Sequence, residues 1–191
     1  INGLTIDGRT VNGGIQYYRT TNLTIAYNRI IDIANGIQSS GGLNGLPANT
    51  LITHNLIYNV FGSSRTALMI TGNPYEAGHG LWTVSYNVID RINYAGFQPQ
   101  GGMGTRIIGN LIQNVTRHGI NFYRERDIEV IGNTFRNVNI RPQDCDTGAI
   151  RFYAPATLGT ESCRGPFLIL NNLIDGCNNG IHVRSCSSSM P

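Results

Sequence analysis

The sequence has 191 residues, of which 40% are hydrophobic and only 13% are charged, and its formal net charge is +3. It contains no Lys, which excludes Lys chemistry, and its Arg residues are scattered rather than clustered, so we expect no nucleic-acid partner. No stretch approaches the roughly 18 apolar residues that span a membrane, so we expect no membrane partner either.

The length fits a single domain, and we expect residues 1–191 to form one. The chain opens at Ile1 inside a strand-like pattern and shows no signal peptide, which is typical of a mature or trimmed chain or of a fragment of a longer one. With so few charges, the polar surface must consist mainly of amides and hydroxyls. Sugar-binding surfaces and structural solenoids both have this composition.

One strand-like motif recurs along the chain, in which alternating apolar residues are followed by Asn and another apolar residue. It occupies residues 23–30, 51–57, 82–89, 105–112, 128–135 and 167–174. Its Asn residues are Asn28, Asn55, Asn87, Asn110, Asn133 and Asn172. We assign Asp7 to the same place in the opening segment. Asn tolerates the left-handed backbone of a tight bend, and stacked Asn side chains can hydrogen-bond to one another, so we expect an Asn ladder at these bends.

A second strand-like motif follows each Asn and begins with a small residue and an apolar one. It occupies residues 14–18, 36–40, 67–71, 96–100, 119–123, 149–153 and 180–184. The interval from Gly96 to Gly119 is 23 residues, and so is the interval from Asn110 to Asn133. A period of about 22–23 residues with short strands is typical of a solenoid, because no turn can bury its apolar residues alone.

Together the two motifs resemble the parallel β-helix repeat of the pectate-lyase-like superfamily, and the resemblance covers essentially the whole chain. It implies an all-β fold, a right-handed parallel β-helix (a solenoid) of about seven turns. The alternative is an antiparallel β-sandwich, which requires short hairpin turns between its strands. The β-branched strands and frequent Gly disfavour helices.

Four Cys residues in a chain that looks extracellular predict disulfides. Cys145 and Cys177 each lie three residues before a Gly that opens a strand, so we expect them on adjacent turns, about 4.8 Å apart. We predict the pairs Cys145–Cys177 and Cys163–Cys186. The alternatives are the local pairs Cys145–Cys163 and Cys177–Cys186, or four free thiols in a cytosolic protein. No Cys or His cluster has the spacing of a zinc site, so we expect no metal.

The second motif also predicts an outward surface, because Ile120 and its equivalents point inward and the residues between them point outward. Parallel rows of amide, Arg and Tyr side chains there suit sugar hydroxyls and ring faces. The candidate substrate-binding residues are Gln98, Asn121, Tyr123, Arg151, Tyr153, His182 and Arg184. Insertions collect on the same side, and we expect them to build a groove that includes Trp82. These insertions occupy residues 41–49, 72–80, 139–147 and 154–166. The alternative is the ordinary solvated face of a solenoid.

Two carboxylates that flank a glycosidic bond are the usual machinery of its hydrolysis. We assign this role to Asp146, Asp144 and Glu161, with Glu76 as another possible partner. Residues 146–150, Asp-Thr-Gly-Ala-Ile, resemble a stretch of several β-helix glycoside hydrolases in which the Asp is catalytic. An Asp before a strand is otherwise a common turn former.

A lyase or epimerase is the second enzymatic possibility. It needs a base for the proton beside a uronate carboxylate and a cation that stabilises the resulting anion. Tyr123, Arg151, His182 and Arg184 could supply these groups. The sequence lacks the Asp-Pro-His-Asp motif of alginate epimerases and the clustered acidic calcium site of pectate lyases. We therefore favour a hydrolase and expect no cofactor.

These observations predict a secreted or cell-surface β-helix whose partner is a polysaccharide, while leaving open whether it is an enzyme. The alternative is a non-catalytic structural, adhesive or fibre-forming module. An uncapped β-helix end exposes strand edges that can pair with another chain. The partner expected for such a module is another copy of the same chain, in an end-to-end or trimeric assembly.

Overall fold

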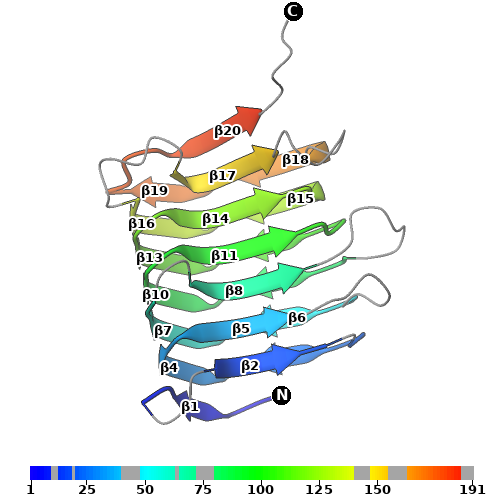
Figure 1. Cartoon of the computed structure of the whole chain (residues 1–191). Helices are drawn as coiled ribbons and strands as arrows, with labels where there is room; N and C mark the ends of the chain where they lie inside the picture. Colours follow the sequence, from blue (N-terminus) through cyan, green and yellow to red (C-terminus); the bar gives the residue numbers. More distant parts are fainter. Residues whose placement is uncertain are drawn as a thin grey trace, which may run out of the picture.

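The computed structural model shows a parallel β-helix with three sheets and, over the part of the chain that it describes, no helix that could cross a membrane. It describes residues 1–9, 13–18, 20–39, 48–62, 65–71, 80–139, 147–154 and 163–185. Figure 1 shows the strands in layers from β1 (Thr5–Asp7) at one end to β20 (Ile181–Ser185) at the other. The paired strands are parallel, so the predicted β-helix is confirmed and the antiparallel sandwich is excluded.

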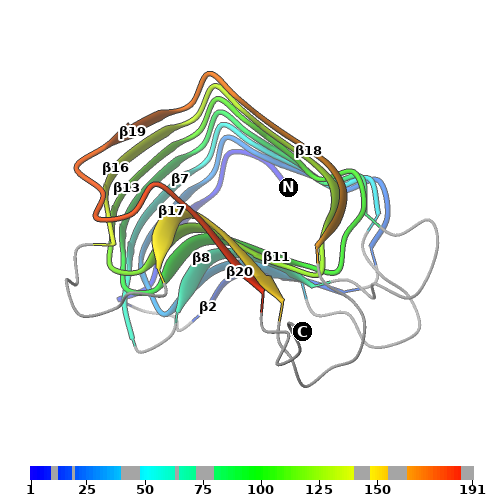
Figure 2. The ribbon, with the colours of Figure 1, turned by 90° about the horizontal axis from the view of Figure 1, so that it is seen from above.

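Each turn passes through three sheets in the same order, which Figure 2 shows around a common interior. Sheet A contains β3 (Thr24–Ala26), β6 (Leu51–Thr53), β9 (Thr83–Ser85), β12 (Arg106–Ile108), β15 (Arg126–Ile131) and β18 (Arg164–Leu170). Sheet B contains β1, β4 (Arg29–Ile33), β7 (Leu56–Val60), β10 (Val88–Ile92), β13 (Leu111–Val115), β16 (Thr134–Val138) and β19 (Leu173–Asp175). Sheet C contains β2 (Gly13–Tyr17), β5 (Asn35–Ser39), β8 (Thr66–Thr71), β11 (Ala95–Gln100), β14 (His118–Tyr123), β17 (Gly148–Ala154) and β20.

Stacked columns of apolar side chains, most of them Ile, fill the interior. Ile25 of β3 lies beside Ile52 of β6, Ile30 of β4 lies beside Ile57 of β7, and all four are fully buried. Alternate residues of a strand point to opposite faces, so the residues between these Ile face outward. β-branched side chains suit such columns because their rotamers are restricted before folding.

The predicted Asn ladder is present at the corner between sheets A and B. The backbone N–H of Asn87 donates to Oδ1 of Asn110 at 2.9 Å, and Nδ2 of Asn87 donates to the same oxygen at 3.0 Å. Asn110 repeats both contacts with Asn133 at 2.9 and 3.0 Å. Nδ2 of Asn110 also donates to the carbonyl of Val84 at 2.9 Å. The ladder therefore satisfies the buried polar groups at this bend on every turn that it joins.

The assignment of Asp7 to the ladder is wrong. Thr5 pairs with Arg29, so Leu4 lies beside Asn28 and donates its backbone N–H to Oδ1 of Asn28 at 3.0 Å. Asp7 lies three residues further on, beside Ile31. The sequence pattern failed here because the first turn replaces the ladder amide with an apolar side chain.

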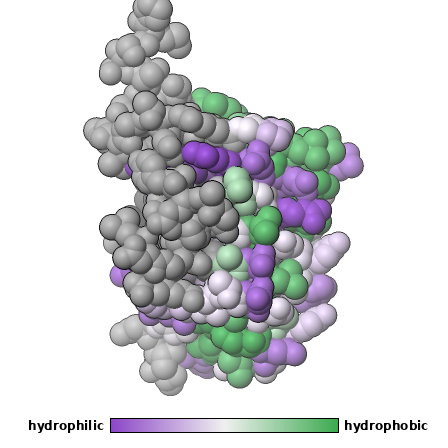
Figure 3. All heavy atoms as spheres, turned by 90° about the vertical axis from the view of Figure 1, so that its right-hand side faces the viewer, coloured by the Kyte–Doolittle hydropathy of each residue, from purple (hydrophilic) through white to green (hydrophobic). Residues whose placement is uncertain are grey.

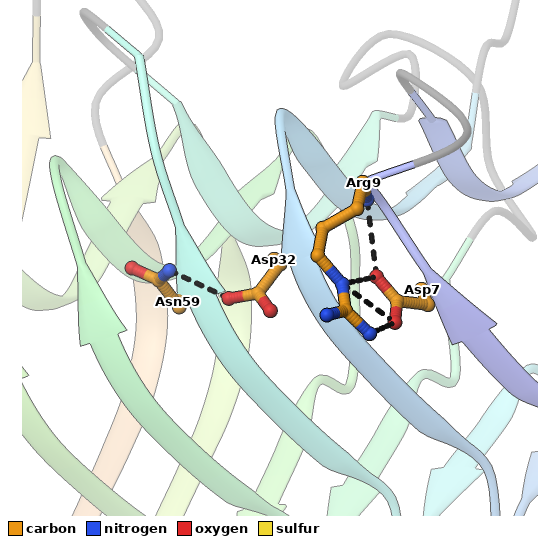
Figure 4. A network of polar contacts seen from close by, with 4 residues as sticks. All are labelled: Asp7, Arg9, Asp32 and Asn59. Carbon is orange, nitrogen blue, oxygen red and sulfur yellow. Dashed lines mark hydrogen bonds and ion pairs between the residues drawn. The ribbon is translucent and has the colours of Figure 1, made fainter.

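Asp7 instead forms an ion pair with Arg9, and Figure 4 shows the two side chains facing each other. Arg9 also donates its backbone N–H to Oδ1 of Asp7 at 3.1 Å. The hydrogen bonds from Arg9 lower the pKa of Asp7 to about 2. In the same view, Nδ2 of Asn59 donates to Oδ1 of Asp32 at 2.7 Å, which joins two successive turns of sheet B.

Left-handed backbone recurs at fixed places in each turn. We had expected the ladder Asn to adopt it, but the residue before the Asn does so instead. The ladder Asn keeps its backbone amide aligned with the helix axis, so the residue before it takes up the bend. The residues at this corner are Tyr27, His54, Tyr86, Gly109, Gly132 and Asn171. The corner before sheet A has Asn22, Asn49, Leu81, Gly104, Asp127 and Gly165. A third place within sheet B has Asp32, Asn59, Arg91, Asn114, Asn137 and Gly176.

Replacing Asn110 with Ala is expected to lower the free energy of unfolding by about 3 kcal/mol, because two buried donors of Asn87 lose their acceptor. Urea unfolding measures the change. Gln113→Ala is the control, since Gln113 faces outward on the adjacent strand β13. Equal losses in the two variants would show that the ladder contributes no more than an ordinary surface side chain.

Candidate functional site

The outer face of sheet C brings together most of the residues expected to bind substrate. Ile120 and Phe122 of β14 belong to the core, so Asn121 and Tyr123 between and after them face outward. Asn121 pairs with Arg151 in the register of the sheet. Tyr123 pairs with Tyr153, Arg151 with His182 and Tyr153 with Arg184. Two rows of polar and aromatic residues therefore run along the face, as expected from the sequence.

Four of these side chains are linked by direct contacts. Nη1 of Arg151 donates to Oδ1 of Asn121 at 3.0 Å. The guanidinium carbon of Arg151 lies 4.2 Å from the centre of the Tyr153 ring, within cation–π distance. The rings of Tyr123 and Tyr153 meet edge to face, with their centres 5.0 Å apart. These contacts hold the Arg151 side chain in one orientation.

Burial distinguishes this part of the face from an ordinary solvated surface. Asn121 is 0% exposed, Arg151 4% and Gln98 8%. Nδ2 of Asn121 is buried and has no hydrogen-bond partner in the structure. Buried amide donors are almost always paired in folded proteins, so this unpaired one is suited to an enclosed water molecule beneath the surface of the face.

Tyr94 joins the site, and the sequence analysis missed it. Its ring contacts His118 edge to face at 5.5 Å, and the guanidinium carbon of Arg117 lies 5.3 Å from its centre. Burial raises the pKa of Tyr94, and interaction with Tyr123 raises it further, while Arg117 lowers it. Tyr94 lies just before the repeated strand motif, so nothing in the motif identified it. We call Tyr94, Asn121, Tyr123, Arg151 and Tyr153 the Tyr–Arg cluster.

The proposed catalytic carboxylates Asp144, Asp146 and Glu161 lie outside the described residues. Their roles therefore remain predictions. Among the described residues, no group of three or more His, Cys, Asp or Glu side chains is placed to hold a metal ion.

Each predicted disulfide joins a described Cys to Cys145 or Cys186, which lie outside the described residues, and neither disulfide is formed in the structure. Cys163 and Cys177 carry free thiols in the structure. Burial raises the pKa of Cys163 to about 11 and also raises that of Cys177. A thiol with a raised pKa holds little thiolate at neutral pH, so neither Cys is suited to act as a nucleophile.

One titratable group lies inside the β-helix rather than on the candidate site. Glu125 is 0% exposed, and its carboxylate accepts hydrogen bonds from the backbone N–H of Gly102 at 2.7 Å and from Thr105 Oγ1 at 2.6 Å. Burial raises its pKa to about 7, although both hydrogen bonds act in the opposite direction. A raised pKa is common in active sites. Glu125 is closed off from solvent, so we assign it to the interior.

Trp82 was expected on the groove, and this expectation is wrong. The side chain is fully buried in the core. A Cβ atom at Gly102 would lie 2.6 Å from the Trp82 ring and 2.8 Å from Oε2 of Glu125. Gly102 therefore leaves the space that both side chains need. The insertion before Trp82 hid the fact that this residue starts the next regular turn.

No protein-family model matches the chain, and no curated protein matches it in sequence. Two of the solved structures that are similar in shape are those of an epimerase and a glucanase. One is the periplasmic alginate epimerase AlgG, with a TM-score of 0.45 and 14% identity over 91% of this chain and 48% of that chain. The other is the catalytic unit of a thermostable GH87 α-1,3-glucanase from Streptomyces thermodiastaticus strain HF3-3, with a TM-score of 0.43 and 14% identity over 99% of this chain and 46% of that chain. The chain spans about half of either structure, and these likenesses say nothing about what it acts on.

Glu125 is expected to make the protein less stable as the pH rises. Its pKa is about 7 when folded and near the ordinary 4.5 when unfolded, so its neutral form stabilises the fold below pH 4.5, and this contribution is lost as the pH rises through 7. The loss should reach about 3 kcal/mol. Urea unfolding at several pH values, followed by fluorescence of Trp82, measures it.

Glu125→Gln should remove most of this pH dependence. The control is Glu129→Gln, because Glu129 lies on the outer face of sheet A and pairs with Arg106. If Glu125→Gln and the wild type lost stability in parallel between pH 4.5 and 8, Glu125 would not be the group responsible.

Proposed function

We propose that this chain is a carbohydrate-active β-helix that binds a polysaccharide along the outer face of sheet C. The observation that carries the proposal is the Tyr–Arg cluster. An Arg held by Asn121 and Tyr153, an unpaired buried amide and two outward Tyr rings lie on the adjacent strands β14 and β17. Amide and guanidinium groups suit the hydroxyls of a sugar, and aromatic rings suit its apolar face.

We further propose that the reaction is hydrolysis of a glycosidic bond, with Asp146 as a catalytic carboxyl and Asp144 or Glu161 as its partner. Asp146 precedes Gly148, the first residue of β17, by two residues in the sequence. The same strand carries Arg151 of the cluster. In a retaining or an inverting hydrolase, one carboxyl protonates the leaving oxygen and the second attacks the sugar or activates a water.

Proton abstraction from a uronate is the second reaction class. In this case Arg151, with His182 on the next strand, would stabilise the anion that forms beside the carboxylate. Tyr123 is the candidate base. We propose a location outside the cytoplasm for either reaction, because polysaccharide substrates are met there.

A non-catalytic module that self-associates is the other candidate function. The side chains of the last described turn that should line the core are partly exposed, with Val183 72%, Ile181 52% and Phe167 42% exposed. Apolar surface at the end of a β-helix favours packing against another layer of strands. Further turns of a longer chain would provide that layer, and so would end-to-end or trimeric association.

Asp146→Asn is expected to abolish release of reducing ends from a polysaccharide substrate, because Asn can neither protonate the leaving oxygen nor act as a nucleophile. We would assay wild type and variant on neutral and uronate polysaccharides, following reducing ends and the absorbance of unsaturated products. Asp90→Asn is the control, since Asp90 lies on sheet B and an Asn there can still accept from Asn114.

Three outcomes separate the candidates. Unsaturated product that survives Asp146→Asn would assign a lyase. Hydrolysis that survives the substitution would remove Asp146 from the mechanism. If no polysaccharide of the panel releases product and light scattering shows assemblies larger than a monomer, the structural module is favoured.

Arg151→Met is expected to lower kcat/KM by about tenfold to a hundredfold, because a buried charged hydrogen-bond donor is lost from the substrate face. Steady-state kinetics on the best substrate of the panel measures the effect. Arg106→Met is the control, because it makes the same substitution on the exposed face of sheet A. Equal activity in the two variants would place the substrate elsewhere, provided that both variants unfold at the temperature of the wild type.

A further inference from the structure

A column of three aromatic residues lies on the corner between sheets A and B, one on each of three successive turns. The rings of Tyr27 and His54 are stacked, with their centres 4.9 Å apart and their planes 22° apart. The rings of His54 and Tyr86 are 5.3 Å apart. We call these three residues the aromatic column. Figure 2 shows this corner on the side of the β-helix opposite sheet C.

The aromatic column occupies backbone positions that disfavour bulky side chains. Tyr27, His54 and Tyr86 have φ angles of 56°, 54° and 54°. Other turns place Gly109 and Gly132 at the same corner. A left-handed backbone is unfavourable for residues with a large side chain, and departures of this kind gather at binding sites.

Burial does not compensate for this unfavourable backbone. Tyr27 is 62% exposed and Tyr86 is 56% exposed. Stacking between the rings offsets part of the cost. Figure 3 shows the neighbouring side of the molecule, which carries β6, β15 and β18, with hydrophobic and hydrophilic residues interspersed over its described part. On this side of the corner, therefore, the column does not continue into a large apolar patch.

The two ends of the column differ. A Cβ atom at Gly109 would lie 2.7 Å from the Tyr86 ring, so the ring already covers that position. At the other end, Asn2 pairs with Ala26, which places Gly3 beside Tyr27. A Cβ atom at Gly3 would meet nothing within 4 Å. One face of the Tyr27 ring is stacked on His54, and no described aromatic ring stacks on its other face.

Hydrogen-bonding groups run beside the rings. Ser85 Oγ donates to Thr53 Oγ1 at 3.0 Å, and Thr53 Oγ1 lies 2.8 Å from Nδ1 of His54. The hydroxyl of Thr53 and Nδ1 of His54 form a hydrogen bond in which either group can be the donor. The residue after each ring is an uncharged ladder Asn, and the residue before each ring is Ala26, Thr53 or Ser85.

We propose that the aromatic column is a second carbohydrate-binding surface, at which a pyranose ring of a neutral polysaccharide stacks on the open face of Tyr27 over Gly3. The polysaccharide then follows the column, where the exposed ring of His54 forms a hydrogen bond with a sugar hydroxyl. Flat rings beside uncharged polar groups suit the apolar face and hydroxyls of a neutral sugar. This site does not depend on catalysis at sheet C. It would let one molecule hold one polysaccharide strand while the outer face of sheet C engages another.

Affinity gel electrophoresis tests the proposal, with hydroxyethyl cellulose, xyloglucan, galactomannan and dextran as neutral probes and polygalacturonate as an acidic one. Tyr27→Asn removes the stacking ring, and Asn is tolerated at this backbone position, as at Asn171. Gly3→Asn leaves the ring in place and fills the open space, at a φ of 70° that Asn also accepts. We expect each variant to bind the retarding neutral probe about tenfold more weakly.

Leu81→Asn is the matched control. Leu81 is 61% exposed and has a φ of 55°, but it lies at the corner before sheet A. It should bind like the wild type. Thermal unfolding should show no loss of stability for Tyr27→Asn, since Asn suits the left-handed backbone better than Tyr does. If that variant fails to fold, Gly3→Asn still decides the question.

The proposal is overturned if no neutral probe retards the wild type, if only polygalacturonate does, or if Gly3→Asn binds as tightly as the wild type. Binding lost equally in Leu81→Asn would also overturn it. Arg151→Met separates this site from the proposed function. Neutral-probe binding that survives Arg151→Met, with turnover lost, would leave both proposals standing. Turnover unchanged by Arg151→Met would remove the sheet C proposal alone.

Discussion

The hydrogen bonds of the Asn ladder fix the register on which the rest of the molecule depends. In each of these bonds, the backbone N–H and the side-chain amide of one Asn share Oδ1 of the Asn on the next turn. The amides are buried, so a shift by one residue would leave several donors without partners. It would also turn every apolar residue of a strand to the outside. One bend therefore determines which residues of all three sheets form the core.

The ladder also makes the fold tolerant of insertions. Asn110 and Asn133 are 23 residues apart in the sequence, whereas Asn133 and Asn172 are 39 residues apart. The hydrogen bonds have the same lengths of 2.9 and 3.0 Å in both cases. Each turn returns to the same register after its loop. A β-helix can thus vary its loops, and with them its chemistry, without disturbing the core.

Polar chemistry in this protein is divided between interior and surface. Inside, Glu125 meets two donors and is isolated from solvent, so its raised pKa affects stability. Outside, Arg151 is held by Asn121 and an aromatic ring on one side of the molecule, and the aromatic column marks the opposite corner. The two outer surfaces share only the rigid scaffold between them. Each can therefore be changed by substitution with little effect on the other.

The sequence alone determined the parallel β-helix, the six Asn of the ladder and the outward rows of sheet C, because a strict alternation and a period near 23 residues leave few ways to bury the apolar side chains. Only the tertiary structure decided which outward residues are buried and touching, as in the contact between Asn121 and Arg151, 30 residues apart. It also moved Trp82 into the core and replaced Asp7 with Leu4 at the foot of the ladder. The physical reason is that side-chain contacts between turns depend on the strand register and on the length of the loops. A short sequence motif specifies neither the register nor the loop length.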